Sequence, residues 1–174
     1  MIKSKPLVGV PAKYGLIASG FYILLFFILA YFKDNPYDTI KWVDFLLIPI
    51  FVYFSIREFK VIHNHRELRY WQGMTLGFIC YMVIAVTAAL FVYAYFGLID
   101  PENFLAYKQE KVDLVMSQKD KLMAEMSEET YRRTLENTRT ITKISLSLDT
   151  FLRKVFTGLF LTIVISVTQR TKSR

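Results

Sequence analysis

Four stretches of the chain combine long apolar runs with few or no charged side chains, and polar segments separate them. The first, residues 14–32, has 19 residues without a charge, and the third, residues 73–99, has 27. As a helix rising about 1.5 Å per residue, the first extends roughly 28 Å, close to the ~30 Å hydrocarbon core of a bilayer. We therefore predict that both stretches cross a membrane as α-helices.

The second stretch is shorter. Its uncharged part covers residues 45–56, and a helix over residues 40–56 must include Lys41 and Asp44. Lys41 can extend its charged end to the membrane surface, and a proline is tolerated in a membrane helix when its neighbours satisfy the freed carbonyl group. We predict a spanning helix here, with a re-entrant or surface segment as the alternative.

The fourth stretch is uncharged over residues 155–168. It becomes long enough to span if the helix starts at Phe151 and if Arg153 and Lys154 direct their charged ends outward to the interface. We predict a transmembrane helix over residues 151–168.

A polar insert, residues 102–150, lies between the third and fourth stretches. Its first half repeats apolar residues at helical spacing, and Ser127 then has the pattern of a helix N-cap followed by acidic residues. Residues 144–148 alternate like a strand, but a lone strand would leave its backbone groups unpaired, so we expect helix. The next apolar positions step by three and four into the fourth stretch, which predicts one continuous helix: Ile141, Ile144, Leu148, Phe151 and Val155.

The predicted fold class is therefore all-α. We expect a polytopic membrane helix bundle in which residues 1–174 form a single membrane domain. Its four transmembrane helices cover about residues 14–32, 40–56, 73–99 and 151–168, with the helical insert 102–150 between the third and the fourth.

Composition agrees with this fold through its distribution along the chain. Charged residues make up 21% of the sequence, which is near the soluble norm of about 25%. The net charge is +7, but the basic residues lie beside apolar runs and no nucleic-acid-binding module accompanies them. We expect the lipid bilayer and its anionic headgroups as the partner, and no nucleic acid.

Basic residues also predict the orientation. Ten Lys and Arg residues fall in the two chain ends and in residues 57–72, against two in the first loop. Short basic loops favour the cytoplasmic side, so we predict cytoplasmic termini and a periplasmic insert. The ten basic and ten acidic residues between positions 100 and 154 weaken this argument, because the insert is shorter than the ~60-residue limit of the rule.

Small residues recur four apart in the third stretch, at Gly73 and Gly77 and again at Ala85 and Ala89. Such pairs allow close helix approach, which drives helix association in lipid. We interpret them as packing positions against the chain's own helices, with a homodimer seam as the alternative.

Three polar residues are candidates for chemistry. Asp44 is the only acid that could enter the bilayer, where acids mark functional sites, but its closeness to Trp42 favours an interfacial, solvated carboxylate. His63 and His65 could bind a metal only with a further ligand such as Glu58 or Glu67, because zinc sites need three or four ligands, so we interpret them as loop histidines. We predict no catalytic residues, no metal and no cofactor.

The leading hypothesis for function is a non-enzymatic interaction or accessory protein, based on the amphipathic insert and on the expected lack of buried polar groups. A small transporter or transporter subunit is the alternative. It would require Asp44, Thr75, Thr87 and Thr162 to line one wet cavity. An intramembrane enzyme ranks last, because no nucleophile–base pair is evident.

Three segments carry a resemblance to a known family. They are Lys13–Ile17 at the start of the first stretch, Tyr70–Gly73 with Gly77 at the start of the third, and Tyr95–Pro101 at its end. In this order the chain resembles a bacterial membrane family called domain of unknown function 4199. The resemblance implies four helices, a long polar insert and a bacterial inner membrane location, and it brings no activity.

Overall fold

The computed structural model describes residues 4–32 and 36–171. The described residues form helices and no strand, which confirms the all-α prediction. The α-helices are α1 (Ser4–Phe32), α2 (Pro36–Glu58), α3 (Tyr70–Ala94), α4 (Pro101–Ser117), α5 (Lys119–Glu125), α6 (Glu128–Arg139) and α7 (Lys143–Gln169). Wide π-helical turns extend α2 at Phe59–His63 and α3 at Tyr95–Ile99.

Four helical segments are long and apolar enough to cross a membrane. They cover residues 5–32, 36–63, 70–99 and 143–169, with lengths of 28, 28, 30 and 27 residues. Each exceeds the roughly 20 residues that a spanning helix needs. The second and fourth segments are much longer than their uncharged cores, because charged residues continue the second at both ends and the fourth at its start.

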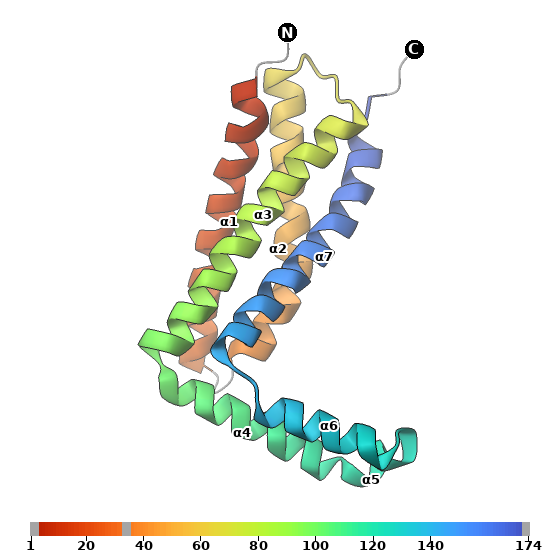
Figure 1. Ribbon diagram of the computed structural model, residues 1–174. Coiled ribbons are helices and arrows are strands. Elements are labelled where there is room, and N and C mark those ends of the chain that lie inside the picture. The colour runs from red at the N-terminus through yellow and green to blue at the C-terminus, as the bar shows by residue number, and fades with distance from the viewer. Residues whose placement is uncertain (1–3, 33–35, 172–174) are drawn as a thin grey trace. The chain divides into compact units, whose positions relative to one another are not determined.

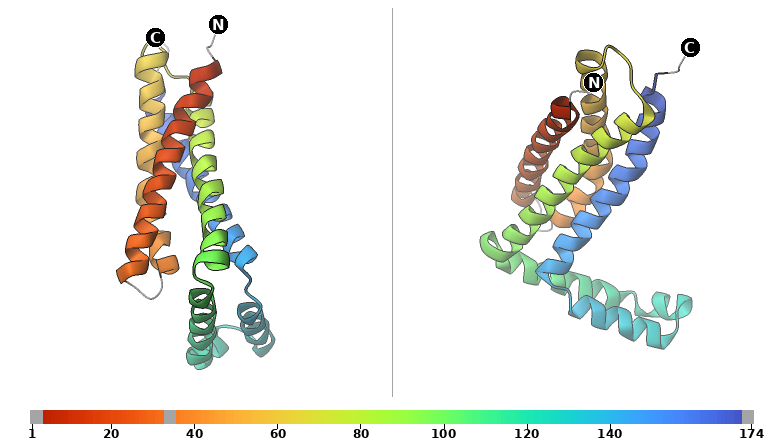
Figure 2. Two further views of the ribbon diagram at one scale, coloured as in Figure 1. Left: turned by 90° about the vertical axis from the view of Figure 1, so that its left-hand side faces the viewer. Right: turned by 45° about the horizontal axis from the view of Figure 1, so that its top comes forward.

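The chain divides into two compact units. One contains residues 1–91 and 149–174, and the other contains residues 92–148. The first unit holds α1, α2, most of α3 and most of α7, which run alongside one another in Figures 1 and 2. The second unit holds α4, α5 and α6. The second unit covers most of the predicted insert, residues 102–150, and the single membrane domain stays a prediction.

Polar contacts join one end of the first unit. The Thr171 backbone donates to the Leu68 carbonyl at 2.9 Å, and Lys60 donates to the Gln169 carbonyl at 2.7 Å. Glu58 of α2, two residues before Lys60, forms an ion pair with Lys13 of α1 at 2.7 Å. The start of α1 and the end of α7 therefore lie at the same end of the bundle, as four antiparallel helices require.

Small residues set how closely the helices of this unit approach. A Cβ atom added at Gly77 would lie 2.2 Å from the Thr162 side chain of α7, and one at Gly73 would lie 2.8 Å from Ser166. On the other side of α3, Gly15 of α1 approaches the Cys80 carbonyl with the same lack of space. Ala85 is fully buried, and Ala89 is half-buried. The face of α3 with Gly73 and Gly77 thus packs on α7 of the same chain.

The second unit is a helical hairpin with an aromatic interior. Phe96 contacts Phe104 and Tyr107 at ring-centroid distances of 5.9 and 6.4 Å, and Tyr131 is buried on α6. The predicted N-cap is confirmed, because the Ser127 hydroxyl accepts a hydrogen bond from the Thr130 backbone at 3.3 Å.

The prediction of one continuous helix from Glu128 into the fourth span is wrong. The helix ends at Arg139, and α7 begins at Lys143. Thr142 and Ser145 hydrogen-bond reciprocally, each side chain accepting from the other's backbone N–H at 3.1 and 2.9 Å. This capping arrangement satisfies the first N–H groups of α7 and starts a new helix despite the continuous apolar pattern.

We expect the substitution Gly77→Ala to destabilise the bundle by about 1–3 kcal/mol, because the added methyl group has no room beside Thr162. The melting temperature in detergent should fall by several degrees. Gly20→Ala is the matched control, since nothing lies within 4 Å of its added Cβ, and its melting temperature should not fall. Equal effects in the two variants would contradict the packing that we describe.

Candidate functional site

A buried ion pair joins α2 to α7. Asp44 and Lys154 are respectively 3% and 0% exposed, and the Lys154 ammonium donates a hydrogen bond to the Asp44 carboxylate. Removing either charge from water costs several kcal/mol, and only a close partner of opposite sign offsets this cost. Each residue therefore accounts for the burial of the other.

The positions of these two residues correct the predictions from sequence. Asp44 is not a solvated interfacial carboxylate, and Lys154 does not extend outward to the membrane surface. Both side chains turn inward because each supplies the charge that the other requires. The expected lack of buried polar groups is also wrong, since these two are buried together with Ser19, Ser55, Gln72, Thr150, Thr162 and Ser166.

Helix geometry places Asp44 inside the hydrocarbon layer, nearer one surface than the other. Glu58, which binds Lys13 and Tyr14, lies at the polar end of α2. Asp44 lies 14 residues before it, or about 21 Å along the helix axis. In a hydrocarbon core of about 30 Å, Asp44 is then well below the far surface. Charged groups at such depth are costly and mark sites of function by default.

Tyr22 of α1 completes the surroundings of the ammonium group. The Lys154 Nζ atom lies 3.8 Å from the centre of the Tyr22 ring, within the ~6 Å range of a cation–π contact. Tyr22 itself is 1% exposed. The ammonium group thus has two partners, a carboxylate from α2 and an aromatic face from α1, and three helices meet at this point.

A second polar group, which we call the Tyr37 cluster, consists of Tyr37, Asp149, Thr150 and Arg153. The Tyr37 hydroxyl donates to Asp149 at 3.0 Å and lies 3.1 Å from the Thr150 hydroxyl. Arg153 donates to Asp149 at 2.9 Å and to the Tyr37 hydroxyl at 3.4 Å. The side chain of Asp149 is 57% exposed and that of Arg153 is 25% exposed.

Among the charged side chains of α7 at this site, exposure decreases from Asp149 through Arg153 to Lys154. Arg153 also carries an atom that the described residues leave unsatisfied, because its buried Nε–H has no hydrogen-bond partner. A buried donor of this kind costs about 1–3 kcal/mol unless water or a ligand accepts from it. The cluster and the ion pair together bring two carboxylates, a phenol and two cationic side chains to the contact between α2 and α7.

The other residues singled out from sequence do not join this site. His63 and His65 are exposed at the opposite end of α2, and His65 has a left-handed backbone with φ of 50°. No group of three or more His, Cys, Asp or Glu side chains in the described parts of the chain is arranged to hold a metal ion. Gly73 and Gly77 act in the packing described above, whereas a packing role of Ala85 and Ala89 stays a prediction.

The four residues that a transporter cavity would need are not gathered together. Thr162 contacts Gly77, eight residues or about 12 Å along α7 from Lys154, and the Thr75 hydroxyl donates to the Trp71 carbonyl of its own helix. Sequence reasoning missed Lys154 as the partner of Asp44. The available signal was one acid and one base, each at the edge of a short apolar run.

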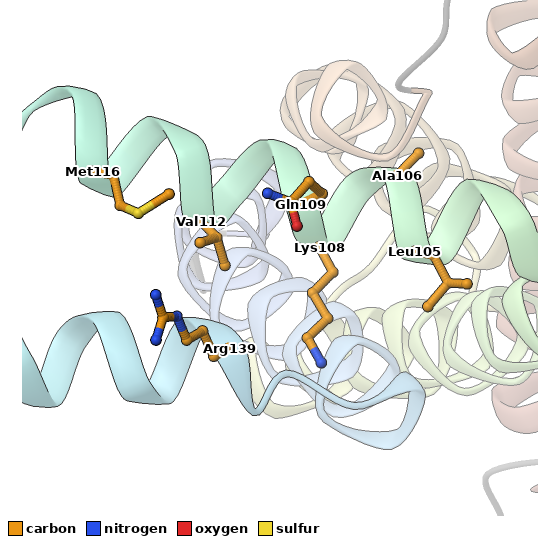
Figure 3. Close-up of a pocket in the computed structure, with 7 residues that line it drawn as sticks. All are labelled: Leu105, Ala106, Lys108, Gln109, Val112, Met116 and Arg139. Atoms are coloured by element: carbon orange, nitrogen blue, oxygen red, sulfur yellow. The ribbon is translucent and has the colours of Figure 1, made fainter.

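The second unit has a candidate site of its own, a groove between α4 and α6 (Figure 3). Leu105, Val112 and Met116 supply apolar side chains, and Lys108 and Arg139 point toward the gap from opposite helices. Leu105 is 63% exposed, which is unusual for a large apolar side chain outside the membrane segments. We call this surface the hairpin groove.

Comparison with known proteins gives one finding. The family model described as "Protein of unknown function (DUF4199)" matches residues 13–171, nearly the whole chain. No curated protein matches the chain, and no solved structure does.

Removing one partner of the buried ion pair should destabilise the protein by about 3–5 kcal/mol, because the other charge is left uncompensated. We expect Lys154→Met and Asp44→Leu each to lower the melting temperature strongly. The double variant Asp44→Leu/Lys154→Met should recover most of the loss. A double-mutant cycle read by thermal unfolding in detergent measures this coupling.

The exposed pair of Glu129 and Arg133, 2.6 Å apart on α6, is the matched control. Its side chains are about three-quarters exposed, so Arg133→Ala should change stability by less than about 1 kcal/mol. Additive losses in the Asp44 and Lys154 variants would show that the two charges do not interact.

Proposed function

We propose, for a chain that belongs to the DUF4199 family of proteins of unknown function, a non-enzymatic role in protein–protein contact. The four apolar helices anchor the protein in the membrane, and the hairpin groove between α4 and α6 binds the partner. The observation that carries this proposal is the exposed apolar surface of that groove with two basic side chains beside it.

The groove has the features of a recognition surface. Soluble segments seldom expose large apolar side chains together, and those that do commonly bind a partner. Leu105 and Met116 are exposed at 63% and 41%, and Val112 lies between them. All three come from α4, at spacings of seven and four residues, so they form one stripe on that helix.

Charge indicates which partner fits. Lys108 and Arg139 line the groove, and neither forms an ion pair among the residues that the structure describes. A partner segment that places acidic side chains beside an apolar face, such as an amphipathic helix, complements both features. A second copy of this chain is the other candidate partner.

We further propose a multi-pass location in the bacterial inner membrane, with both termini cytoplasmic and the hairpin periplasmic. The support is the basic loop at residues 57–72 and the basic residues of the chain ends. Of the latter, Lys3, Lys172 and Arg174 lie outside the described residues.

A topology reporter fused after Arg174 tests the orientation. We expect a reporter that works only in the cytoplasm to be active when it is fused after Arg174. At Gln118, between α4 and α5, we expect activity only from a reporter that works in the periplasm. Periplasmic activity of the fusion after Arg174 would reverse the orientation that we propose.

Photocrosslinking tests the groove. A photoreactive amino acid at Met116 should yield one discrete adduct with another membrane or periplasmic protein, and the same group at Lys121 on α5, outside the groove, should not. The double substitution Lys108→Glu/Arg139→Glu should reduce the adduct about tenfold, because it replaces attraction by repulsion. The charge-conserving Lys108→Arg/Arg139→Lys should retain it.

An adduct of twice the chain mass would show that the partner is a second copy of this chain. Equal crosslinking from Met116 and Lys121, or an adduct unaffected by charge reversal, would refute the groove as the binding surface. A small transporter or transporter subunit remains the second candidate function, and the buried Asp44–Lys154 pair is the observation that favours it.

A further inference from the structure

We propose that the Asp44–Lys154 pair is a proton-exchange site inside the membrane, reached through the Tyr37 cluster. This inference goes beyond the role in protein contact and does not depend on the hairpin groove. If the pair only held α2 and α7 together, the two charges would suffice. The structure has two further features that such a link does not require.

The first feature is the series of polar groups that leads inward. Asp149 is exposed to 57%, Arg153 to 25%, and Lys154 not at all, and Tyr37 hydrogen-bonds the first two of these. The buried Arg153 Nε–H has no partner among the described residues, so a water molecule at this atom would satisfy it. A series of polar groups therefore leads from the exposed Asp149 carboxylate through the Tyr37 hydroxyl to Arg153, the residue next to Lys154.

The second feature is the Tyr22 ring. When Asp44 is ionised, the ammonium of Lys154 is held by the carboxylate and by the ring face at 3.8 Å. When Asp44 takes up a proton, the carboxylate charge is lost and the cation keeps only the ring. Tyr22 thus provides a partner for Lys154 in the protonated state, which makes that state accessible within the bilayer.

Proton uptake by Asp44 conserves atoms and charge. A hydronium ion on the side of the Tyr37 cluster gives up a proton and becomes water, and an O–H bond forms on the Asp44 carboxylate. Lys154 keeps its three N–H bonds and loses its ion pair with α2. Proton uptake therefore raises the charge of the pair from zero to plus one and weakens the link between α2 and α7.

Groups from every helix of the bundle surround this site. Tyr22 comes from α1, and Tyr37 from α2 lies in the cluster with Asp149 and Arg153 of α7. Arg153 is a further charge that acts on both members of the pair. On α3 the buried ionisable side chains are Cys80 and Tyr81, and Tyr81 packs against Gly158, four residues beyond Lys154.

Infrared difference spectroscopy of the full chain in lipid vesicles tests the proposal. On acidification, we expect the C=O band of a protonated carboxylic acid in an apolar environment, and its loss in Asp44→Asn. Asp44→Glu keeps the charge and should shift the band, so the assignment holds even if Asp44→Asn does not fold. Asp149→Asn should keep the band, because Asp149 is exposed.

Substitutions of Tyr22 and Tyr37 distinguish proton exchange from a purely structural role of the pair. Tyr22→Phe retains the aromatic face and should keep the band, whereas Tyr22→Leu removes it and should reduce the band at least tenfold at the same pH. Tyr37→Phe removes the hydroxyl of the cluster and should slow the appearance of the band after a pH jump about tenfold, with its final amplitude unchanged.

Two results would overturn the proposal. One is the absence of a carboxylic acid band at every pH at which the wild-type protein keeps its melting temperature. The other is a band that persists in Asp44→Asn or keeps its position in Asp44→Glu. The crosslinking experiment on the hairpin groove gives its answer independently of both.

Discussion

Inside a hydrocarbon layer no water is available to hydrogen-bond a peptide group or to solvate a charge, and every feature of the first unit follows from this condition. Helices satisfy their backbone internally, and the buried Ser19 hydroxyl turns back onto its own helix by donating to the Gly15 carbonyl at 2.8 Å. Charges have no such local solution. Asp44 can be buried because Lys154 reaches it from a helix more than a hundred residues later in the chain.

The same lack of water changes what holds helices together. Apolar side chains gain little by leaving lipid for one another, so close packing and polar contacts must supply the association. Gly73 and Gly77 let α7 approach α3 closely, and Gly158 accommodates the Tyr81 ring. The ion pair adds a link between α2 and α7 whose strength depends on the charge of a single carboxylate. Packing therefore gives the bundle its permanent contacts, and the pair gives it one that protonation can change.

The second unit follows the rules of proteins in water. Its interior is aromatic, Asp100 and Ser127 cap α4 and α6, and its outer faces carry ion pairs such as Glu128–Arg132 at 2.7 Å. Exposed apolar side chains have a cost in this setting that they lack in lipid. Leu105 is the most exposed large apolar side chain of α4, whereas equally exposed leucines on α1 or α3 need no explanation. The two proposals accordingly rest on different physical grounds.

Sequence by itself determined the helical class, the four apolar segments, the polar insert and the N-cap at Ser127, because these depend on neighbouring residues and on run length. It could not determine the break before Lys143, where the Thr142–Ser145 capping contacts outweigh a continuous apolar pattern. Tertiary structure alone decided that Asp44 and Lys154 turn inward. Whether a charge at the edge of an apolar run faces lipid headgroups or the protein interior depends on a partner that only the folded arrangement of helices brings within reach.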